Sequence, residues 1–499
     1  MTEVKRDQTA PASNRKPNIL FIMTDQHRAD MMTCAGRDEV PTPNIDRIAA
    51  RGVRFDNAYC PYPVCVASRM SMLTGLYSHT TGAIDNRDRL DWRYRTMAHH
   101  FAGAGYLTGL IGKMHFNDAH KHGFEYYLSI NDWLMYLGPK VRHYANEIAN
   151  NPIGPNFFNT VNDDGAGFPD VTGLWNGPSP WAGQVEAFDF TDMSSRLEAG
   201  DHLDAFIARE SVKFLRRYRE QPFLLVASFM KPHTPLLPPR EWAERYPVDK
   251  QELPEIGDIS TYPPHVQRRI QGFQNRGELR LRAHAAGYRG NLAFADVCIG
   301  QVLDALDELG LPDNTILVYT SDHGEMDGDH GLFQKFCLFE PAVRVPLIVS
   351  WPKQIPQGKV AAALTEMFGL YPTLVELTGI EAPRSTTLVD LPGAPACMEA
   401  RSFADVLRNP NLPGPPAAFS EHAVRDHNSQ VMIRARRYKF IYNRASTHEL
   451  YDHEADPGER VNRIDDPGYA KVRNELRDQL FAWHNPETAN PAWQRSATA

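Results

Sequence analysis

A cysteine and an arginine stand four positions apart in the segment 59–75, which reads YCPYPVCVASRMSMLTG. The pair is Cys65 and Arg69, with the small residue Ala67 and the hydroxyl of Ser68 between them. A cysteine on its own is most often an inert, buried, small hydrophobic residue, and such a residue needs no cation or hydroxyl beside it. The segment alone therefore leaves two interpretations open, a structural thiol or a chemically active side chain.

Side chains able to do acid–base or metal chemistry follow four predicted strands. They are Asp25 and Gln26 in TDQ, Lys113 and His115 in GKMH, Lys231 and His233 in KPH, and Asp322 and His323 in SDH. Taken singly, an aspartate can cap the next helix and a histidine can be satisfied within a loop. Their recurrence favours one shared site, because α/β sheets gather active-site residues at the carboxyl ends of their strands.

Strand-like and helix-like patterns alternate along most of the chain. Apolar runs predict buried strands at 18–26, 106–113, 222–235 and 315–325. Apolar residues at a helical period predict helices over 42–52, 68–75, 203–220 and 290–310. The alternation predicts an α/β fold in which a large mixed, mostly parallel sheet is sandwiched by helices.

The chain divides into segments of different character. We expect a disordered tail at 1–16, a catalytic domain at 17–380 and, beyond a Pro-rich stretch, a small C-terminal α+β domain at 397–499. Two strands about a turn are expected within 430–443, then a turn-rich stretch and a terminal helix. Residues 131–193 lack periodicity and are rich in Gly, Pro, Asn and Trp, so we expect an irregular insertion that borders a site.

Composition excludes several classes of protein. A net charge of −8 argues against a nucleic-acid-binding surface. No apolar run approaches the ~20 residues of a membrane-spanning helix, so no membrane partner is expected. The six cysteines form neither a CxxC pair nor a dense framework, which disfavours a disulfide scaffold and favours a reducing compartment. We therefore expect a cytoplasmic protein, and its oligomeric state, including a possible homo-oligomer, stays open.

The motifs together resemble a known family. CVASR followed by MSMLTG is similar to the CxPxR or CxAxR signature and Thr-Gly tail of type I sulfatases, members of the alkaline phosphatase-like superfamily. Further motifs match in order, namely PNILFIMTDQ, GVRFDNAYC, GKMHF, KPHTP, TSDHGE and KFIYN with HELYDHEADPGE. The resemblance covers nearly the whole chain and implies an alkaline phosphatase-like fold.

The resemblance gives Cys65 a specific role. It implies that a formylglycine-generating maturation enzyme oxidises Cys65 to formylglycine. The aldehyde hydrate offers one hydroxyl to attack the sulfur of a small-molecule sulfate ester and a second hydroxyl whose deprotonation expels sulfate by C–O cleavage. A serine in its place would form a sulfate ester that water hydrolyses poorly.

The resemblance also implies one divalent metal ion. Its ligands map to Asp25, Gln26, Asp322 and His323, with the modified Cys65 completing the site. Oxygen-dominated ligation favours Ca²⁺ and also suits Mg²⁺. The imidazole of His323 keeps Mn²⁺ or another transition metal open.

The remaining polar residues receive roles from the same resemblance. Arg69 would hold the formylglycine and its metal environment, and Lys113 and Lys335 would bind the sulfate oxygens. His115 would deprotonate the second hydroxyl, and His233 would protonate the leaving oxygen.

Three positions depart from the pattern of many arylsulfatases. Ala67 replaces a proline, Gln26 replaces a second aspartate, and His323 replaces an asparagine. The last two changes occur in the branch that resembles choline sulfatases and phosphonate monoester hydrolases. Asn86 resembles a substrate-side contact in the phosphonate-hydrolysing relatives.

Three functions are therefore compared. The first is a metal-dependent sulfuric ester hydrolase, and the second is a phosphonate monoester or phosphodiester hydrolase that uses the same site. The third is a non-catalytic binding protein in which Cys65 remains a thiol. Four aromatic residues of the insertion could line an apolar or cationic pocket, although buried packing is the favoured interpretation. They are Trp133, Tyr136, Trp175 and Trp181.

Overall fold

The computed structural model describes residues 16–140, 190–424 and 429–487. The tail expected at 1–16, apart from Lys16, lies outside these residues. Most of the insertion expected at 131–193 does too, including Trp175 and Trp181.

An eight-stranded sheet forms the centre of the larger part of the chain. In the order in which they pair, the strands are β4 (Tyr126–Leu128), β3 (Leu107–Gly112), β5 (Phe223–Pro232), β1 (Asn18–Asp25), β6 (Thr315–Ser321), β7 (Leu347–Ser350), β2 (Gly52–Tyr59) and β8 (Lys359–Glu366). Strand β7 runs antiparallel to β6 and β2, and the remaining pairings in the described part of the sheet are parallel. The predicted mixed, mostly parallel sheet is confirmed.

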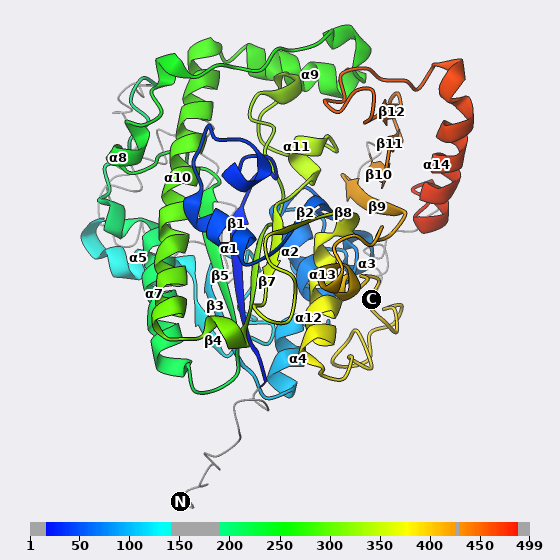
Figure 1. Ribbon diagram of the computed structural model, residues 1–499. Coiled ribbons are helices and arrows are strands. Elements are labelled where there is room, and N and C mark those ends of the chain that lie inside the picture. The colour runs from blue at the N-terminus through cyan, green and yellow to red at the C-terminus, as the bar shows by residue number, and fades with distance from the viewer. Residues whose placement is uncertain (1–15, 141–189, 425–428, 488–499) are drawn as a thin grey trace, which may run out of the picture.

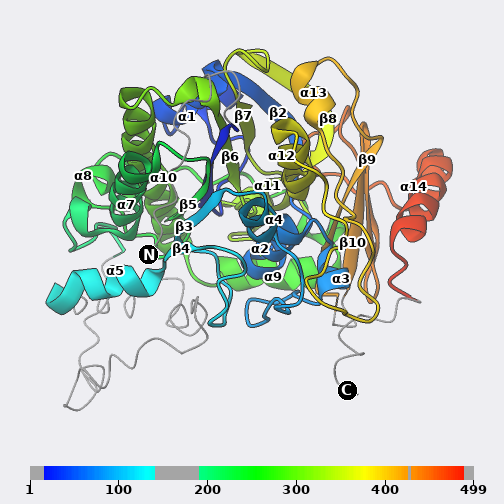
Figure 2. The ribbon, with the colours of Figure 1, turned by 90° about the horizontal axis from the view of Figure 1, so that it is seen from below.

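Strand β1 is apolar along its length because both of its faces are covered. Ile19 and Phe21 belong to one hydrophobic cluster and Leu20 and Ile22 to another, as the two-residue period of a strand requires. Figures 1 and 2 show helices on both faces of the sheet.

Each face has its own set of helices. On the Leu20 face lie α1 (Pro43–Ala50), α5 (Ile130–Leu137), α7 (Leu203–Tyr218), α8 (Arg240–Ala243) and α10 (Glu278–Glu308). On the Phe21 face lie α2 (Cys65–Thr74), α4 (Met97–Gly103), α9 (Pro264–Gln274), α11 (Glu340–Val343), α12 (Leu370–Thr378) and α13 (Ala404–Arg408). The short helix α3 (Ser78–Thr81) follows α2. None of the described helices has the length and hydropathy needed to cross a membrane.

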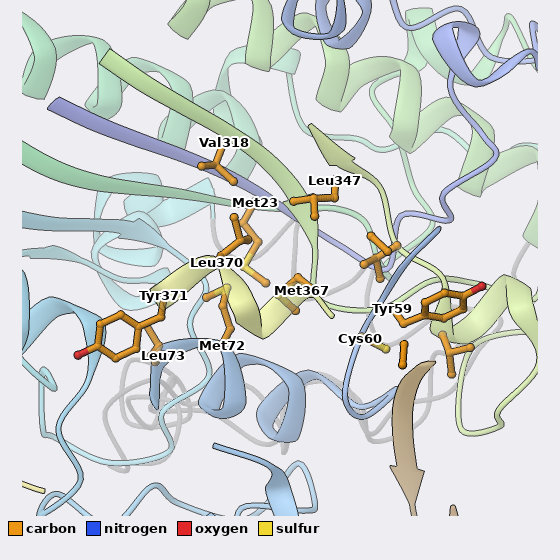
Figure 3. Packing of buried hydrophobic residues seen from close by; sticks show 14 of the residues in the cluster. Met23, Tyr59, Cys60, Met72, Leu73, Val318, Leu347, Met367, Leu370 and Tyr371 are labelled. Carbon is orange, nitrogen blue, oxygen red and sulfur yellow. The ribbon is translucent and has the colours of Figure 1, made fainter. Parts of the chain in front are cut away.

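Helix α2 is terminated by a glycine and anchored along its core face. It runs from Cys65 to Thr74, and the φ of 69° at the following Gly75 lies in the left-handed region that glycine adopts without strain. In Figure 3, Met72 of α2 and Leu370 of α12 lie beside Met23 of β1, and Val318 of β6 lies close by. Large apolar side chains thus anchor the helix that carries the signature to the central strands.

The C-terminal part of the chain is a separate small α+β unit, as predicted. Its antiparallel sheet has the order β12 (Glu449–Asp452), β11 (Tyr438–Asn443), β10 (Gln430–Ala435) and β9 (Ala417–His422). Helix α14 (Ala470–Trp483) covers this sheet and buries Leu476 and Leu480 against it. Figure 1 shows α14 at the outer edge of the molecule.

Three of the differences between the structure and the sequence-based expectation have a clear physical reason. Helix α10 begins at Glu278 rather than near 290. Its first turn is exposed, and the buried residues that follow up to Gly290 are mostly small or polar, so no apolar period is visible there. Strand β12 lies inside the stretch expected to be turn-rich. The start of the expected insertion forms helix α5, because Ser129 caps it and its apolar side chains are buried. One of these is Trp133, whose Nε1 donates to the Asp201 carbonyl, so packing accounts for this residue.

Candidate active site

Four parallel strands bring the predicted site residues to one edge of the sheet. Strands β3, β5, β1 and β6 are consecutive neighbours, so their carboxyl ends lie side by side. Lys113 follows β3, His233 follows β5, Asp25 ends β1 and Asp322 follows β6. Lys231, which sequence analysis also placed at a strand end, instead donates to the Asn291 side chain of α10 over 2.6 Å.

Cys65 lies at the centre of this group. Its side chain is buried, with Sγ 3.2 Å from His323 Nε2 and 3.8 Å from Asp25 Oδ1. The ammonium groups of Lys113 and Lys335 each lie 3.7 Å from Sγ. Burial by itself raises the pKa of the Cys65 thiol, but the charges of the two lysines and of His323 outweigh burial and hold that pKa well below its usual range.

Arg69 joins the two carboxylates of the site. One helical turn after Cys65, it points to the same side of α2. Its Nη2 lies 3.0 Å from Asp25 Oδ2 and its Nε 2.8 Å from Asp322 Oδ2. Its Nη1 donates to Ser228 Oγ over 2.9 Å and to the Lys113 carbonyl. Arg69 therefore fixes the distance between the two aspartates as well as neutralising them.

The two aspartates titrate in opposite directions. Burial and the charge of Cys65 raise the pKa of Asp25. The positive charges of Lys113, whose Nζ lies 2.5 Å from Asp25 Oδ2, and of His233 and Arg69 outweigh them and keep that pKa well below its usual range. The pKa of Asp322 is raised, because burial and the charge of Asp25 outweigh Arg69. Because two buried carboxylates this close compete for the same cations, the pKa of one is lowered while the pKa of the other is raised.

The aspartates leave their second oxygens turned toward a common point. Arg69 and Lys113 occupy Oδ2 atoms, whereas Asp25 Oδ1 and Asp322 Oδ1 each lie 3.7 Å from His323 Nε2. Ligand atoms of Asp25, Cys65, Asp322 and His323 all lie within 4.8 Å of one another. The 3.7 Å separations of the two Oδ1 atoms from His323 Nε2 are too long for hydrogen bonds and suit atoms that share one ion at about 2.0–2.6 Å. The residues therefore fit a divalent metal ion.

Gln26, which sequence analysis expected as a further ligand, lies beside this set. Its Oε1 accepts from Lys335 Nζ over 2.6 Å, and its Nε2 donates to Glu325 Oε2. Its backbone N–H donates to Asp322 Oδ1 over 3.1 Å. The residue has a φ of 69°, a left-handed conformation that costs energy for a residue with a Cβ and is found at functional sites.

The two histidines expected to move protons follow two neighbouring strands, His115 after β3 and His233 after β5. His233 Nε2 lies 3.9 Å from Asp25 Oδ1, and burial together with Lys335 lowers the pKa of His233 to about 4. His115 forms a hydrogen bond with Cys65 that helps to lower the thiol pKa, and its φ is 68°. Gly112, the last residue of β3, allows the backbone that leads to His115 to pass close to β5, because a Cβ there would lie 2.1 Å from the Ser228 carbonyl oxygen.

Asn86 is next to the site, but its side-chain oxygen is already engaged. Oδ1 accepts from the Val66 N–H at the start of α2 over 3.3 Å. Its carbonyl accepts from Asn117 Nδ2 over 2.9 Å. A substrate contact by Asn86 stays a prediction, and the observed contact holds the loop against the helix that carries Cys65.

Three buried residues of the site were given no role by sequence analysis. Glu325 lies in the quoted motif TSDHGE, so its signal was present but unassigned. Ser228 bridges Arg69 and the Lys113 carbonyl, and Ser68 Oγ donates to the Asp322 carbonyl over 2.5 Å. A single serine within a strand or helix gives no sequence signal for such a role.

Comparison with known proteins points to one family. Residues 17–380 match the family model described as Sulfatase, and residues 328–485 match the one described as N-sulphoglucosamine sulphohydrolase, C-terminal. An arylsulfatase of Clostridium perfringens is 30% identical over 480 residues, covering 93% of this chain and 94% of the relative. A choline-sulfatase of Rhizobium meliloti is 28% identical, covering 91% and 83%.

Solved structures share the fold. The phosphonate monoester hydrolase of Agrobacterium radiobacter superposes with a TM-score of 0.75 at 22% identity, covering 94% of this chain and 95% of that one. A protein solved in complex with its substrate D-glucosamine-2-N,6-O-disulfate superposes with a TM-score of 0.69 at 23% identity, covering 96% and 99%.

Proposed function

The chain belongs to the sulfatase family and is a sulfuric ester hydrolase, and we propose that it acts through a formylglycine made from Cys65. The observation that carries this proposal is the position of Cys65 Sγ, which lies among the candidate metal-ligand atoms and 3.7 Å from each of two ammonium groups. A structural core thiol has no need of such surroundings. The modification needs a maturation enzyme that oxidises the thiol to the aldehyde.

The proposed metal ligands are Asp25, Gln26, Asp322 and His323, with residue 65 beside them. Their mainly oxygen donors favour Ca²⁺, and Mg²⁺ or Mn²⁺ would also suit the set. When bound, such an ion lowers the pKa of a nearby hydroxyl and offsets negative charge on the sulfate group. Arg69 keeps the two carboxylates in place and does not depend on the ion for its contacts.

The lysines would hold the sulfate group. The ammonium groups of Lys113 and Lys335 both lie beside the end of the side chain of residue 65, which the substrate sulfur must approach. Their charges can therefore stabilise the negative charge that develops on the sulfate oxygens. Both ammonium groups are buried, which strengthens their field relative to that of exposed lysines.

Two histidines would carry the proton transfers. His115, which is hydrogen-bonded to residue 65, would remove a proton from it, and His233 would protonate the leaving oxygen. Burial and Lys335 keep His233 neutral in the ligand-free site. A bound sulfate monoester brings the negative charge that favours the protonated imidazole.

The test is mass spectrometry of the peptide that contains residue 65, from protein purified from its native host. We expect the mass of the aldehyde in place of the thiol, in a preparation that hydrolyses an aryl sulfate. Full activity in protein whose Cys65 is entirely unmodified would refute the formylglycine proposal. It would leave membership of the sulfatase family intact.

A second substrate class is favoured by one of the proposed ligands. Gln26 stands where many arylsulfatases have a second aspartate, so the site carries one negative charge fewer and can accept the esters of phosphorus as well as sulfur. Comparing kcat/KM for 4-nitrophenyl sulfate and 4-nitrophenyl phenylphosphonate decides the preference. A higher value for the phosphonate would make phosphonate monoester hydrolysis the main activity.

A further inference from the structure

A second cluster of metal-binding side chains lies where the end of α14 meets the catalytic domain. It consists of His79 in α3, Glu421 in β9 and His484 directly after α14. One ligand atom from each of them lies within 4.8 Å of the others. The cluster shares no residue with the one around Cys65.

Glu421 is a buried carboxylate whose charged partner is a histidine. Its Oε1 accepts from the His79 N–H over 2.8 Å, and its Oε2 lies 2.7 Å from His79 Nδ1. The carboxylate side chain has 0% exposure, and that of His79 has 17%. Among the described residues, no lysine or arginine forms an ion pair with Glu421. The His79 imidazolium is therefore the group that compensates this buried charge, a place that a metal cation can take.

Two further carboxyl groups, Glu399 and Glu366, lie near the cluster. Glu399 accepts from the Tyr77 N–H and from Thr80 Oγ1, and Glu366 accepts from the Tyr77 hydroxyl. Glu399 therefore adds negative charge close to His79, which a bound cation would offset.

The ring of His484 is placed as a third ligand. It stacks on the ring of His79 with a centroid distance of 4.1 Å and an interplanar angle of 26°. Two protonated imidazoles at that distance repel one another. At least one of the two rings is therefore neutral, and a neutral imidazole keeps a lone pair for a metal. The ring is partly exposed, which leaves a route for an ion.

We propose that His79, Glu421 and His484 bind a second divalent ion of the zinc class, which fastens the end of α14 to the catalytic domain. Two imidazole nitrogens and one carboxylate oxygen are a zinc ligand set, with water completing the tetrahedron. The oxygen-rich site near Cys65 differs in kind and favours a harder ion. On binding, the proton between His79 Nδ1 and Glu421 Oε2 leaves to solvent, and those two atoms move apart to share the ion.

The test uses the full-length enzyme, stripped with EDTA and then saturated with Ca²⁺ to fill the first site. Titration with Zn²⁺ by calorimetry should show one site in the wild type, and Co²⁺ in its place should give the visible absorption of a tetrahedral nitrogen–oxygen site. The His484→Ala variant should lose at least tenfold in Zn²⁺ affinity and lose the Co²⁺ absorption. Zn²⁺ should raise the unfolding temperature of the wild type but not of this variant.

The matched control is His120→Ala, which removes an exposed histidine outside the cluster. It should bind Zn²⁺ as the wild type does. Because His79→Ala removes the partner of a buried carboxylate and can fail to fold, His484→Ala carries the test. Equal Zn²⁺ affinity in wild type and His484→Ala, or no Co²⁺ absorption in the wild type, would overturn the proposal and leave His79 and Glu421 as an ion pair only.

Discussion

The side-chain amide of Gln26 donates to the carboxylate of Glu325, and this contact decides which end of the amide faces the site. An ionised carboxylate can only accept hydrogen bonds, so Nε2 turns toward Glu325 and Oε1 turns toward Lys335. Burial raises the pKa of Glu325, but His284, 3.4 Å away, and the N–H groups of Asp327 and Gln334 lower it to about 2. Glu325 is thus a positioning residue for a proposed metal ligand.

Replacing Glu325 by Gln should weaken metal binding. The new amide can donate as well as accept, so the orientation of Gln26 is no longer fixed. By analogy with other groups that orient metal ligands, we expect a 10–100-fold loss of metal affinity. Calorimetry on the EDTA-stripped protein measures the affinity, and excess metal should restore most of kcat. An unchanged affinity would show that Gln26 is held by other contacts or is not a ligand.

Replacing Arg69 by Lys should damage the site although the charge is kept. A lysine ammonium cannot reach Asp25, Asp322 and Ser228 at once as the planar guanidinium does. One buried carboxylate then lacks its partner, a change that typically costs about 3–5 kcal/mol. Urea unfolding should show the loss in the metal-free protein, and kcat/KM should fall with it. Wild-type stability in this variant would mean that Lys113 alone compensates both aspartates.

Sequence reasoning placed most residues of the candidate site together but did not give the contacts that hold them. Strand-end motifs placed Asp25, Lys113 and Asp322 together, because parallel neighbours bring their carboxyl ends to one edge. The sequence could not show that Arg69 bridges the two carboxylates, because this contact depends on how α2 crosses the ends of β1 and β6. The partnership of His79 with Glu421 was also hidden, since it joins positions more than 300 residues apart.

The fold was predicted best where the pattern was strong. The apolar run of β1 identified a strand buried on both faces, whereas β2 and β12 were not predicted. Strand β2 mixes Arg54 and Asp56 with apolar residues and is partly exposed, so its sequence lacks a clear run. Pairing with β7 and β8 makes it a strand, and such pairing is a property of the tertiary structure.

Replacing Glu449 by Gln should stabilise the protein at alkaline pH. Burial raises the pKa of Glu449 to about 7, against the hydrogen bonds from Asn443 and Tyr451. The folded state therefore holds a proton that the unfolded state releases near pH 4.5, so this group's contribution to stability is greatest below pH 4.5 and declines up to about pH 7.

The glutamine side chain introduced at this position stays neutral and can still accept from Asn443 while donating to the Tyr451 hydroxyl oxygen. We expect a gain of roughly 1–3 kcal/mol over the wild type at pH 8 and no gain at pH 4. Urea unfolding of the variant and the wild type at both pH values measures this difference in unfolding free energy. The nearby charges of Lys439 and Glu459 stay unchanged in the variant. A variant less stable at pH 8 would mean that Glu449 is ionised in the fold.

Replacing Cys65 by Ser should separate the first chemical step from the recycling of the enzyme. A serine hydroxyl near Lys113 and Lys335 keeps one oxygen at the position of the nucleophile but has no second hydroxyl on the same carbon. The sulfate ester formed on it therefore cannot be expelled by C–O cleavage, and water attacks such an ester slowly. We expect at most about one turnover per molecule and a sulfate mass added to the peptide that contains residue 65, whereas Cys65→Ala should show neither. A quenched-flow burst with an aryl sulfate, followed by peptide mass spectrometry, measures both quantities. Sustained turnover by the serine variant, in a preparation free of wild-type enzyme, would show that water or another residue is the nucleophile.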